Sequence, residues 1–176
     1  MNLIYTKISP SVSDAVFVEK RNQRFCCSPF PGRPVLHAHP ELELVFIQSG
    51  YGKRIIGNTV DDFDAGELVF IGKNVPHVWL NHADFYQNDP ALESRHIFVY
   101  FNASQFENLF EAIEEFRRIR MLIHKSVRGI KVTGETRRLI TVKLEELLTL
   151  SGMEKMLCFL NILHLMSISE HIACID

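Results

Sequence analysis

The segment 41–48 constrains the fold more than any other, because it alternates like a β-strand and is apolar on both faces. Successive side chains of a strand point to opposite faces of the sheet. One face carries Glu43, Val45 and Ile47, and the other face is entirely apolar: Leu42, Leu44 and Phe46. We therefore expect a central strand that is covered on both sides, with Glu43 as its one deeply buried polar group.

The rest of residues 1–101 is rich in β-branched and aromatic residues, and Gly and Pro divide it into short runs. Turn-forming residues recur between these runs, for example around Gly50 and at Asp64–Gly66. Many short strands separated by turns favour a sandwich or a barrel. We expect strands near residues 15–18, 24–28, 41–48, 53–58, 67–71, 77–81 and 95–101.

Residues 102–176 differ in composition: they are rich in Leu, Glu, Lys and Arg, and their apolar residues recur at helical spacing. Helices are expected near residues 105–117, 119–126, 135–150 and 153–168. The last of these is apolar almost all round, so it needs partners on more than one side. Its surplus apolar surface predicts a homodimer. The candidate dimerisation residues are Leu144, Leu148, Leu157, Leu160 and Leu163.

Three histidines and a glutamate in the β-rich half have the spacing of a metal site. His37 and His39 can share one face of a strand, and Glu43 and His77 can face the same interior. Three imidazole nitrogens and one carboxylate suit a divalent ion such as Zn, Fe, Mn or Ni, with positions left open for water or a ligand. The same groups could instead hydrogen-bond one another, buried water or the hydroxyls of a ligand without any metal.

Two further residues are candidates for ligand binding. Trp79 shares a strand face with His77 and could pack in the core or form a stacking wall for a ring or a sugar. Arg33 lies in a Pro-rich loop before the histidines. It could reach an anionic or hydroxylated ligand, or it could be a solvated loop residue.

Composition excludes several classes of protein. The chain has 176 residues, 47% of them hydrophobic, and a net charge of −2. It therefore lacks the basic surplus that is typical of nucleic-acid-binding domains. It shows neither a transmembrane stretch nor a signal peptide, so we expect no membrane association and a cytoplasmic location. The four cysteines contain no CxxC pair and are expected to be reduced thiols.

The run from His37 to Gly50 resembles the first cupin motif, because it has the HxH, Glu and Gly positions of that motif. The run from Gly66 to Asn81 is similar to the second cupin motif and contains His77. It departs from the common pattern, with Gly72 and Asn74 where many cupins carry Pro and Gly. The chain is also similar in sequence to the N-terminal sensor domains of AraC/XylS-type bacterial transcription regulators. The similarity covers residues 37–79 and the later helical segments.

This resemblance implies a cupin-type β-barrel (a double-stranded β-helix or jelly roll) over residues 1–101, followed by a helical dimerisation and linker region over 102–176. It also implies a non-enzymatic role. The barrel would bind a small-molecule effector such as a carbohydrate, and DNA would be bound only through a C-terminal helix-turn-helix domain that this sequence does not contain. The expected ligand-binding residues are Arg33, His37, His39, Glu43, His77 and Trp79.

Two alternatives compete with the sensor hypothesis. The first is a metal-dependent cupin enzyme of the dioxygenase or sugar isomerase type, which the four potential ligands favour. The second is a structural dimerisation module whose barrel binds nothing.

Overall fold

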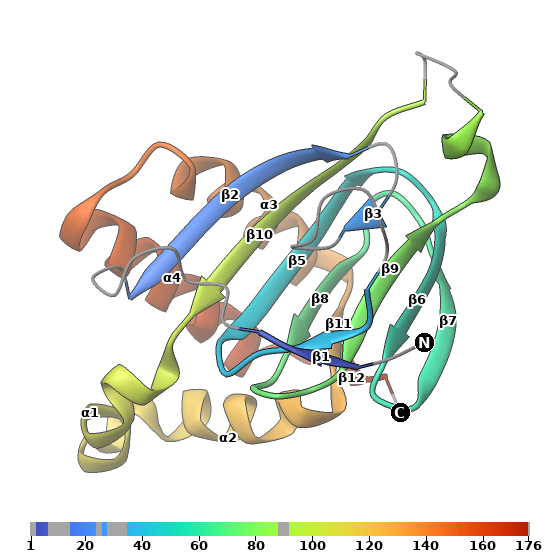
Figure 1. The fold of residues 1–176 in the computed structure, drawn as a ribbon. Helices are drawn as coiled ribbons and strands as arrows, with labels where there is room; N and C mark the ends of the chain where they lie inside the picture. The colour runs from blue at the N-terminus through green and yellow to red at the C-terminus, as the bar shows by residue number, and fades with distance from the viewer. Residues whose placement is uncertain (1–2, 7–14, 24–25, 28–34, 88–91, 176) are drawn as a thin grey trace.

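The computed structural model describes residues 3–6, 15–23, 26–27, 35–87 and 92–175. They form two β-sheets that face each other, and helices pack on the outer side of one of them (Figure 1). The prediction of a mainly β fold with additional helices is confirmed.

The helix-covered sheet has the strand order β12-β11-β8-β5-β10-β2, and all its pairings are antiparallel. β5, the strand expected to be central, lies between β8 and β10. The bounds of these strands are β2 Val16–Gln23, β5 Leu42–Ser49, β8 Leu68–Ile71, β10 Ser94–Phe101, β11 Ile130–Val132 and β12 Ile172–Cys174.

The second sheet has the order β1-β4-β9-β6-β7, and β3 also pairs with β9. β1 runs parallel to β4, whereas the other pairings are antiparallel. The bounds of these strands are β1 Ile4–Tyr5, β3 Cys26–Cys27, β4 His37–Ala38, β6 Gly52–Ile56, β7 Thr59–Phe63 and β9 His77–Asn81.

The two sheets are not closed into the expected barrel, since no pairing among the described strands joins one sheet to the other. The chain passes from β5 to β6 through a corner at Gly50, which has a φ of +114°. A Cβ atom at Gly50 would lie 2.6 Å from the Ser94 hydroxyl, so the corner needs glycine for both conformation and space. A corner of this kind redirects the strand and ends its hydrogen-bond ladder.

The two faces of β5 belong to two different hydrophobic cores, as its alternation predicted. Val45 and Ile47 pack between the sheets with Trp79 and Phe98. The opposite face of β5 packs under the helices, with Leu42, Leu44 and Phe46. Glu43 points to the interior between the sheets and is 2% exposed.

Four helices follow β10: α1 Glu107–Ala112, α2 Arg117–Lys125, α3 Gly134–Leu147 and α4 Gly152–Ser167. They cover the outer face of the helix-covered sheet (Figure 1) and bury Phe159, Ile162 and Met166 against it. β11 and β12, which the sequence did not predict, add two strands from this half to the same sheet. None of the described helices is both long and apolar enough to cross a bilayer.

Candidate metal centre

Four side chains from separate parts of the chain converge in the space between the sheets. His37 comes from β4, His77 from the neighbouring β9, His39 from the loop after β4, and Glu43 from β5. One potential ligand atom of each lies within 4.8 Å of all the others, and each residue is at most 3% exposed. The predicted grouping of these four residues is therefore confirmed.

Each histidine is oriented by a backbone carbonyl on its Nδ1 side. Nδ1 of His37 lies 2.8 Å from the carbonyl oxygen of Val35, and Nδ1 of His77 lies 2.8 Å from that of Val75. Nδ1 of His39 lies 3.1 Å from the carbonyl oxygen of Glu41. A carbonyl can only accept, so each Nδ1 carries a proton and donates it. The three Nε2 atoms are thereby left to face the centre.

Glu43 joins two of these Nε2 atoms. Its Oε2 atom lies 2.7 Å from Nε2 of His39 and 2.9 Å from Nε2 of His77. The carboxylate can only accept, so a proton on Nε2 is required for each of these hydrogen bonds. Protons thus occupy the positions where a metal ion would bind the same nitrogens.

The centre perturbs the acidity of its members in opposite directions. Burial alone would lower the pKa of His77, but the charge and hydrogen bond of Glu43 and the Val75 carbonyl together raise it. Burial would raise the pKa of Glu43, but His77 and His39 hold it well below its usual range. Burial and the charge of His77 lower the pKa of His37 to about 4. Glu43 and His77 thus favour each other's charged forms, whereas His37 is held in its neutral form.

The donor set and its spacing fit a divalent ion. Two donor atoms at about 2.1 Å from one ion can be at most about 4.2 Å apart. The two ligand atoms that are farthest apart would therefore have to approach each other by roughly half an ångström to bind the same ion. Three imidazoles and a carboxylate are ligands that Zn²⁺, Fe²⁺, Mn²⁺ and Ni²⁺ accept. His37, His39, Glu43 and His77 could therefore hold one such ion.

Aromatic side chains enclose the centre. The ring of Tyr100 lies 5.7 Å from that of His39, and the ring of Trp79 lies 5.9 Å from that of His77. Trp79 is 1% exposed and belongs to the core between the sheets. Its Nε1 atom is buried without a hydrogen-bond partner among the described residues. A role for Trp79 as a wall for a ligand remains a prediction.

A further carboxylate next to the centre was not singled out in the sequence. Glu41 is 2% exposed, and its Oε2 atom lies 3.5 Å from Nδ1 of His39. Neither oxygen of this carboxylate has a hydrogen-bond partner among the described residues. The alternation along β5 contains the signal, because Glu41 has the same parity as Glu43.

A second polar group faces the same interior from β10 and β2. His96 lies in β10 and is fully buried, with its ring 2.8 Å from the Ser94 hydroxyl. Burial and the charge of Arg21 lower the pKa of His96 to about 3, so it is neutral. The guanidinium of Arg21 lies 4.9 Å from the centre of the Phe98 ring. The space between the sheets thus carries polar groups at both ends.

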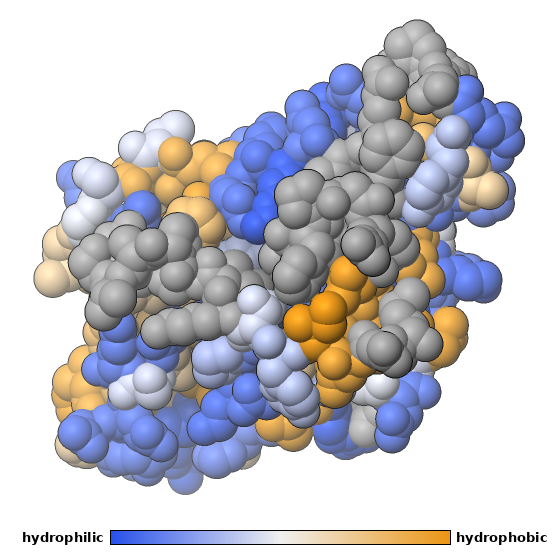
Figure 2. Space-filling model, in the orientation of Figure 1, coloured by the Kyte–Doolittle hydropathy of each residue, from blue (hydrophilic) through white to orange (hydrophobic). Residues whose placement is uncertain are grey.

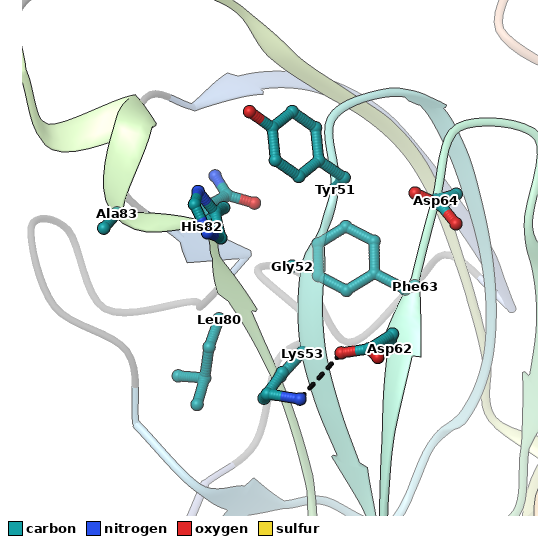
Figure 3. A pocket seen from close by; sticks show the side chains of 10 residues that line it. Tyr51, Gly52, Lys53, Asp62, Phe63, Asp64, Leu80, His82 and Ala83 are labelled. Atoms are coloured by element: carbon teal, nitrogen blue, oxygen red, sulfur yellow. Dashed lines mark hydrogen bonds and ion pairs between the residues drawn. The ribbon is translucent and has the colours of Figure 1, made fainter.

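Arg33, a predicted ligand-binding residue, lies outside the described residues. A separate cavity of about 480 Å³ opens beside β6, β7 and the end of β9 (Figure 3), and none of the four converging side chains lines it. Lys53 and Asp62 form an ion pair of 2.7 Å at its edge. The hydroxyl of Tyr51, which also lines this cavity, donates to Asp84 over 2.6 Å.

The predicted dimerisation residues differ in how accessible they are. Leu144 and Leu163 are fully buried in the core of the chain itself, so they are not available to a second copy. Leu148 and Leu160 are half-buried against the same core. Leu157 is 59% exposed.

The sequence matches no protein-family model, and no protein of curated function matches it. Among solved structures it is similar to a cupin 2 conserved barrel domain protein from Salinispora arenicola. That match has 17% identity and a TM-score of 0.40, and it covers 60% of this chain and 78% of the other.

Two further structures have weaker similarity. Oxalate decarboxylase from Bacillus subtilis, whose description names Mn(II) centres, is 19% identical over 55% of this chain and 24% of its own, with a TM-score of 0.38. EutQ from Clostridium difficile is 15% identical over 49% of this chain and 56% of its own, with a TM-score of 0.34. This chain thus spans only a quarter of the decarboxylase and about half of EutQ.

Proposed function

We propose that this protein binds one divalent transition-metal ion through His37, His39, Glu43 and His77. One observation carries the proposal: three Nε2 atoms and a carboxylate converge, while every Nδ1 atom is already committed to a backbone carbonyl. Such an arrangement fixes the tautomers that metal ligation needs. Hydrogen bonding alone would not require all three rings to be oriented in this way.

The residues of the chain supply what the ion needs from its surroundings. Strand pairing between His37 and His77 fixes the spacing of two ligands, and Glu43 supplies a negative charge. Tyr100 and Trp79 exclude water from two sides. When bound, the ion would supply Lewis acidity toward an oxygen ligand at any position the protein leaves open.

A titration tests metal binding. Protein dialysed against a chelator is titrated with Mn²⁺ or Co²⁺ in a calorimeter, and saturable binding is expected. His77→Ala should weaken it by at least about tenfold, because second-shell losses alone reach this size and a ligand is worth more. His164→Ala, at an exposed position on α4, is the control. Equal binding by wild type and His77→Ala would contradict the proposal.

We further propose that the centre serves ligand sensing in a cupin-type domain of an AraC/XylS-type regulator. Two features support this role. The interior between the sheets combines the histidines with a second polar group at Arg21 and His96, which suits a small hydroxylated effector such as a sugar. Helices packed against the other face of β5 could transmit a change at Glu43 through the same strand.

Dimerisation is part of this proposal and rests on the surface of α4. Met153, Leu157 and Ile168 are 70%, 59% and 46% exposed, and hydrophobic side chains are visible on the side where α4 lies (Figure 2). Val142 of α3 is 55% exposed. Exposed apolar side chains on packed helices are typical of subunit contacts. A second copy of the chain would cover them.

A metal-dependent enzyme is the second candidate, because an octahedral ion such as Mn²⁺ held by four protein ligands keeps two coordination positions free for a substrate. The two roles differ in what happens to a bound ligand. Metal-loaded protein is incubated with a panel of sugars and small carboxylates, and both binding and chemical change are followed by calorimetry and mass spectrometry. A compound that binds and is recovered unchanged supports sensing. Metal-dependent conversion of a panel member supports the enzyme.

A further inference from the structure

A cavity of about 370 Å³ lies on the outer side of the helix-covered sheet, away from the space between the sheets. The loops after β4, β8 and β10 form one side of it, and α1 and α2 form the other. Its volume falls within the range of about 300–1,000 Å³ that is usual for small-molecule sites. Its apolar lining includes Leu42, Phe110 and Ile123.

The rim of this cavity carries side chains of both charge signs, and only some of them are paired within the protein. Arg120 donates to the backbone carbonyls of Phe110 and Ile113 and lies 3.9 Å from Glu111 and 3.6 Å from Glu114. Glu111 and Glu114 therefore compensate the charge of Arg120. Glu107 lies in the first turn of α1, where the backbone N–H groups favour a negative charge.

Two further side chains carry N–H donors. Lys73 and His124 both line the cavity, and neither has an ion-pair or hydrogen-bond partner among the described residues. An apolar lining with unpaired basic groups at the rim suits a molecule that has a short apolar body and one carboxylate.

The same rim holds two of the metal-centre histidines in place. Asn74, which lines the cavity, donates its backbone N–H to the carbonyl oxygen of His39 over 2.7 Å. The next residue, Val75, provides the carbonyl that accepts from Nδ1 of His77. Pro40, which also lines the cavity, directly follows His39. A molecule in the cavity would therefore contact the loops that position both ligands.

We propose that this cavity binds a small monocarboxylate with an apolar body, and that its occupation tightens metal binding at the His–Glu centre. The carboxylate pairs with Lys73 and His124, and the apolar body contacts Leu42 and Phe110. Occupation restrains the loop 72–76 in the arrangement that orients His39 and His77. The coupling, but not the carboxylate site itself, rests on the proposed metal binding.

Binding is tested with hexanoate on the chelator-treated protein, by calorimetry or by ligand-observed NMR. Hexanol and hexylamine have the same apolar body without the negative charge, so both should bind at least about tenfold more weakly. Equal or tighter binding of hexylamine would overturn the assignment of a carboxylate.

Two variants locate the site. Lys73→Met should weaken hexanoate binding about tenfold, because it removes one charge-assisted hydrogen bond. Ala103→Trp, at a half-buried position of the lining, should fill the cavity and abolish binding. Lys53→Met removes an exposed lysine on the second sheet and should change nothing. Hexanoate binding that survives both Lys73→Met and Ala103→Trp in folded protein would overturn the proposal.

The coupling is tested by repeating the Mn²⁺ titration with saturating hexanoate. The dissociation constant for the metal should fall at least about fivefold in wild type and stay unchanged in Lys73→Met, and metal should tighten hexanoate binding by the same factor. Metal binding that hexanoate does not affect would overturn the coupling. Hexanoate binding without any metal binding would instead contradict the proposed function and leave the carboxylate site standing.

Discussion

Asn74 donates its backbone N–H to the carbonyl oxygen of His39 over 2.7 Å. This hydrogen bond joins the loop that contains His39 to the loop that precedes His77. Two residues earlier, Gly72 donates to the carbonyl oxygen of Ser126 over 2.8 Å. The loop between β8 and β9 is thus tied both to the metal centre and to the helical half.

Gly72 lies where many cupins carry Pro, which could not donate this hydrogen bond. A Cβ atom here would lie 2.7 Å from the backbone nitrogen of Val127 and 2.8 Å from the carbonyl carbon of Ser126. Gly72→Ala should therefore lower the free energy of unfolding by about 1–3 kcal/mol, as measured by urea denaturation.

Asn74→Gly is the matched control for this loop. Asn74 has a φ of +60°, a conformation that glycine adopts more easily. The change keeps the backbone N–H and should alter stability by less than about 1 kcal/mol. A Gly72→Ala protein as stable as wild type would show that the loop and the helical half are not held together at this point.

Metal affinity should rise with pH. The raised pKa of His77 means that its Nε2 proton is retained to a higher pH than in a free imidazole, and a metal ion must displace it. Affinity should increase by up to about tenfold per pH unit while one proton is released, and level off above the pKa of His77. Titrations at pH 6, 7 and 8 in buffers of different ionisation enthalpy measure the proton count. A constant affinity without proton release would rule out ligation by His77.

The metal-free protein should lose stability in acid because of His37. Its pKa is lowered to about 4 in the folded state, against about 6.5 in the unfolded chain. The unfolded chain therefore binds an extra proton between these values, and stability falls as pH drops through this window. The full loss is on the order of 3 kcal/mol.

His37→Asn can keep the hydrogen bond to Val35 but has no titrating group, so its stability should depend less on pH between 6.5 and 4. Thermal unfolding of wild type, His37→Asn and the control His164→Ala across this range makes the comparison. Parallel curves for wild type and His37→Asn would contradict the assignment.

Leu157→Asp tests the proposed dimer surface on α4. Leu157 is 59% exposed, so a charge there should leave the monomer folded while it disrupts a contact between copies. Leu160→Asp should also disrupt the dimer, but it should destabilise the chain as well, because Leu160 packs against the core under the helices. Light scattering and circular dichroism separate the two effects. A Leu157→Asp protein that remains dimeric would place the interface elsewhere.

Much of the fold follows from local pattern. The alternation of β5 predicted a central strand with two covered faces. The spacing of the three histidines and Glu43 predicted that their side chains converge, which the structure confirms. The first signal lies within eight neighbouring residues, whereas in the second His77 follows Glu43 by 34 positions. The helices α2, α3 and α4 were predicted within a few residues of their ends, because their apolar periodicity is strong. The helix expected over 105–117 ends early, at Ala112, since Ile113 has an extended backbone.

The remainder depends on contacts between distant segments. β11 and β12 have three residues each and exist only because β8 offers an edge to pair with. The sequence of β7 favours a turn and a loop instead of a strand, because Asp61 and Asp62 interrupt its apolar pattern. Arg54 gave no local signal that it would be buried and paired with Glu67 at 2.8 Å. The corner at Gly50, which ends β5 before a barrel can close, depends on the position of Ser94.

Elemental analysis of protein purified without added metal tests the central claim most directly. Wild type and the control His164→Ala should each contain close to one equivalent of Zn, Fe, Mn or Ni per chain. Glu43→Gln and His39→Ala should lose it while they keep the circular dichroism spectrum of a folded protein. Folded wild-type protein that contains none of these metals, and takes up none when they are supplied, would contradict the account.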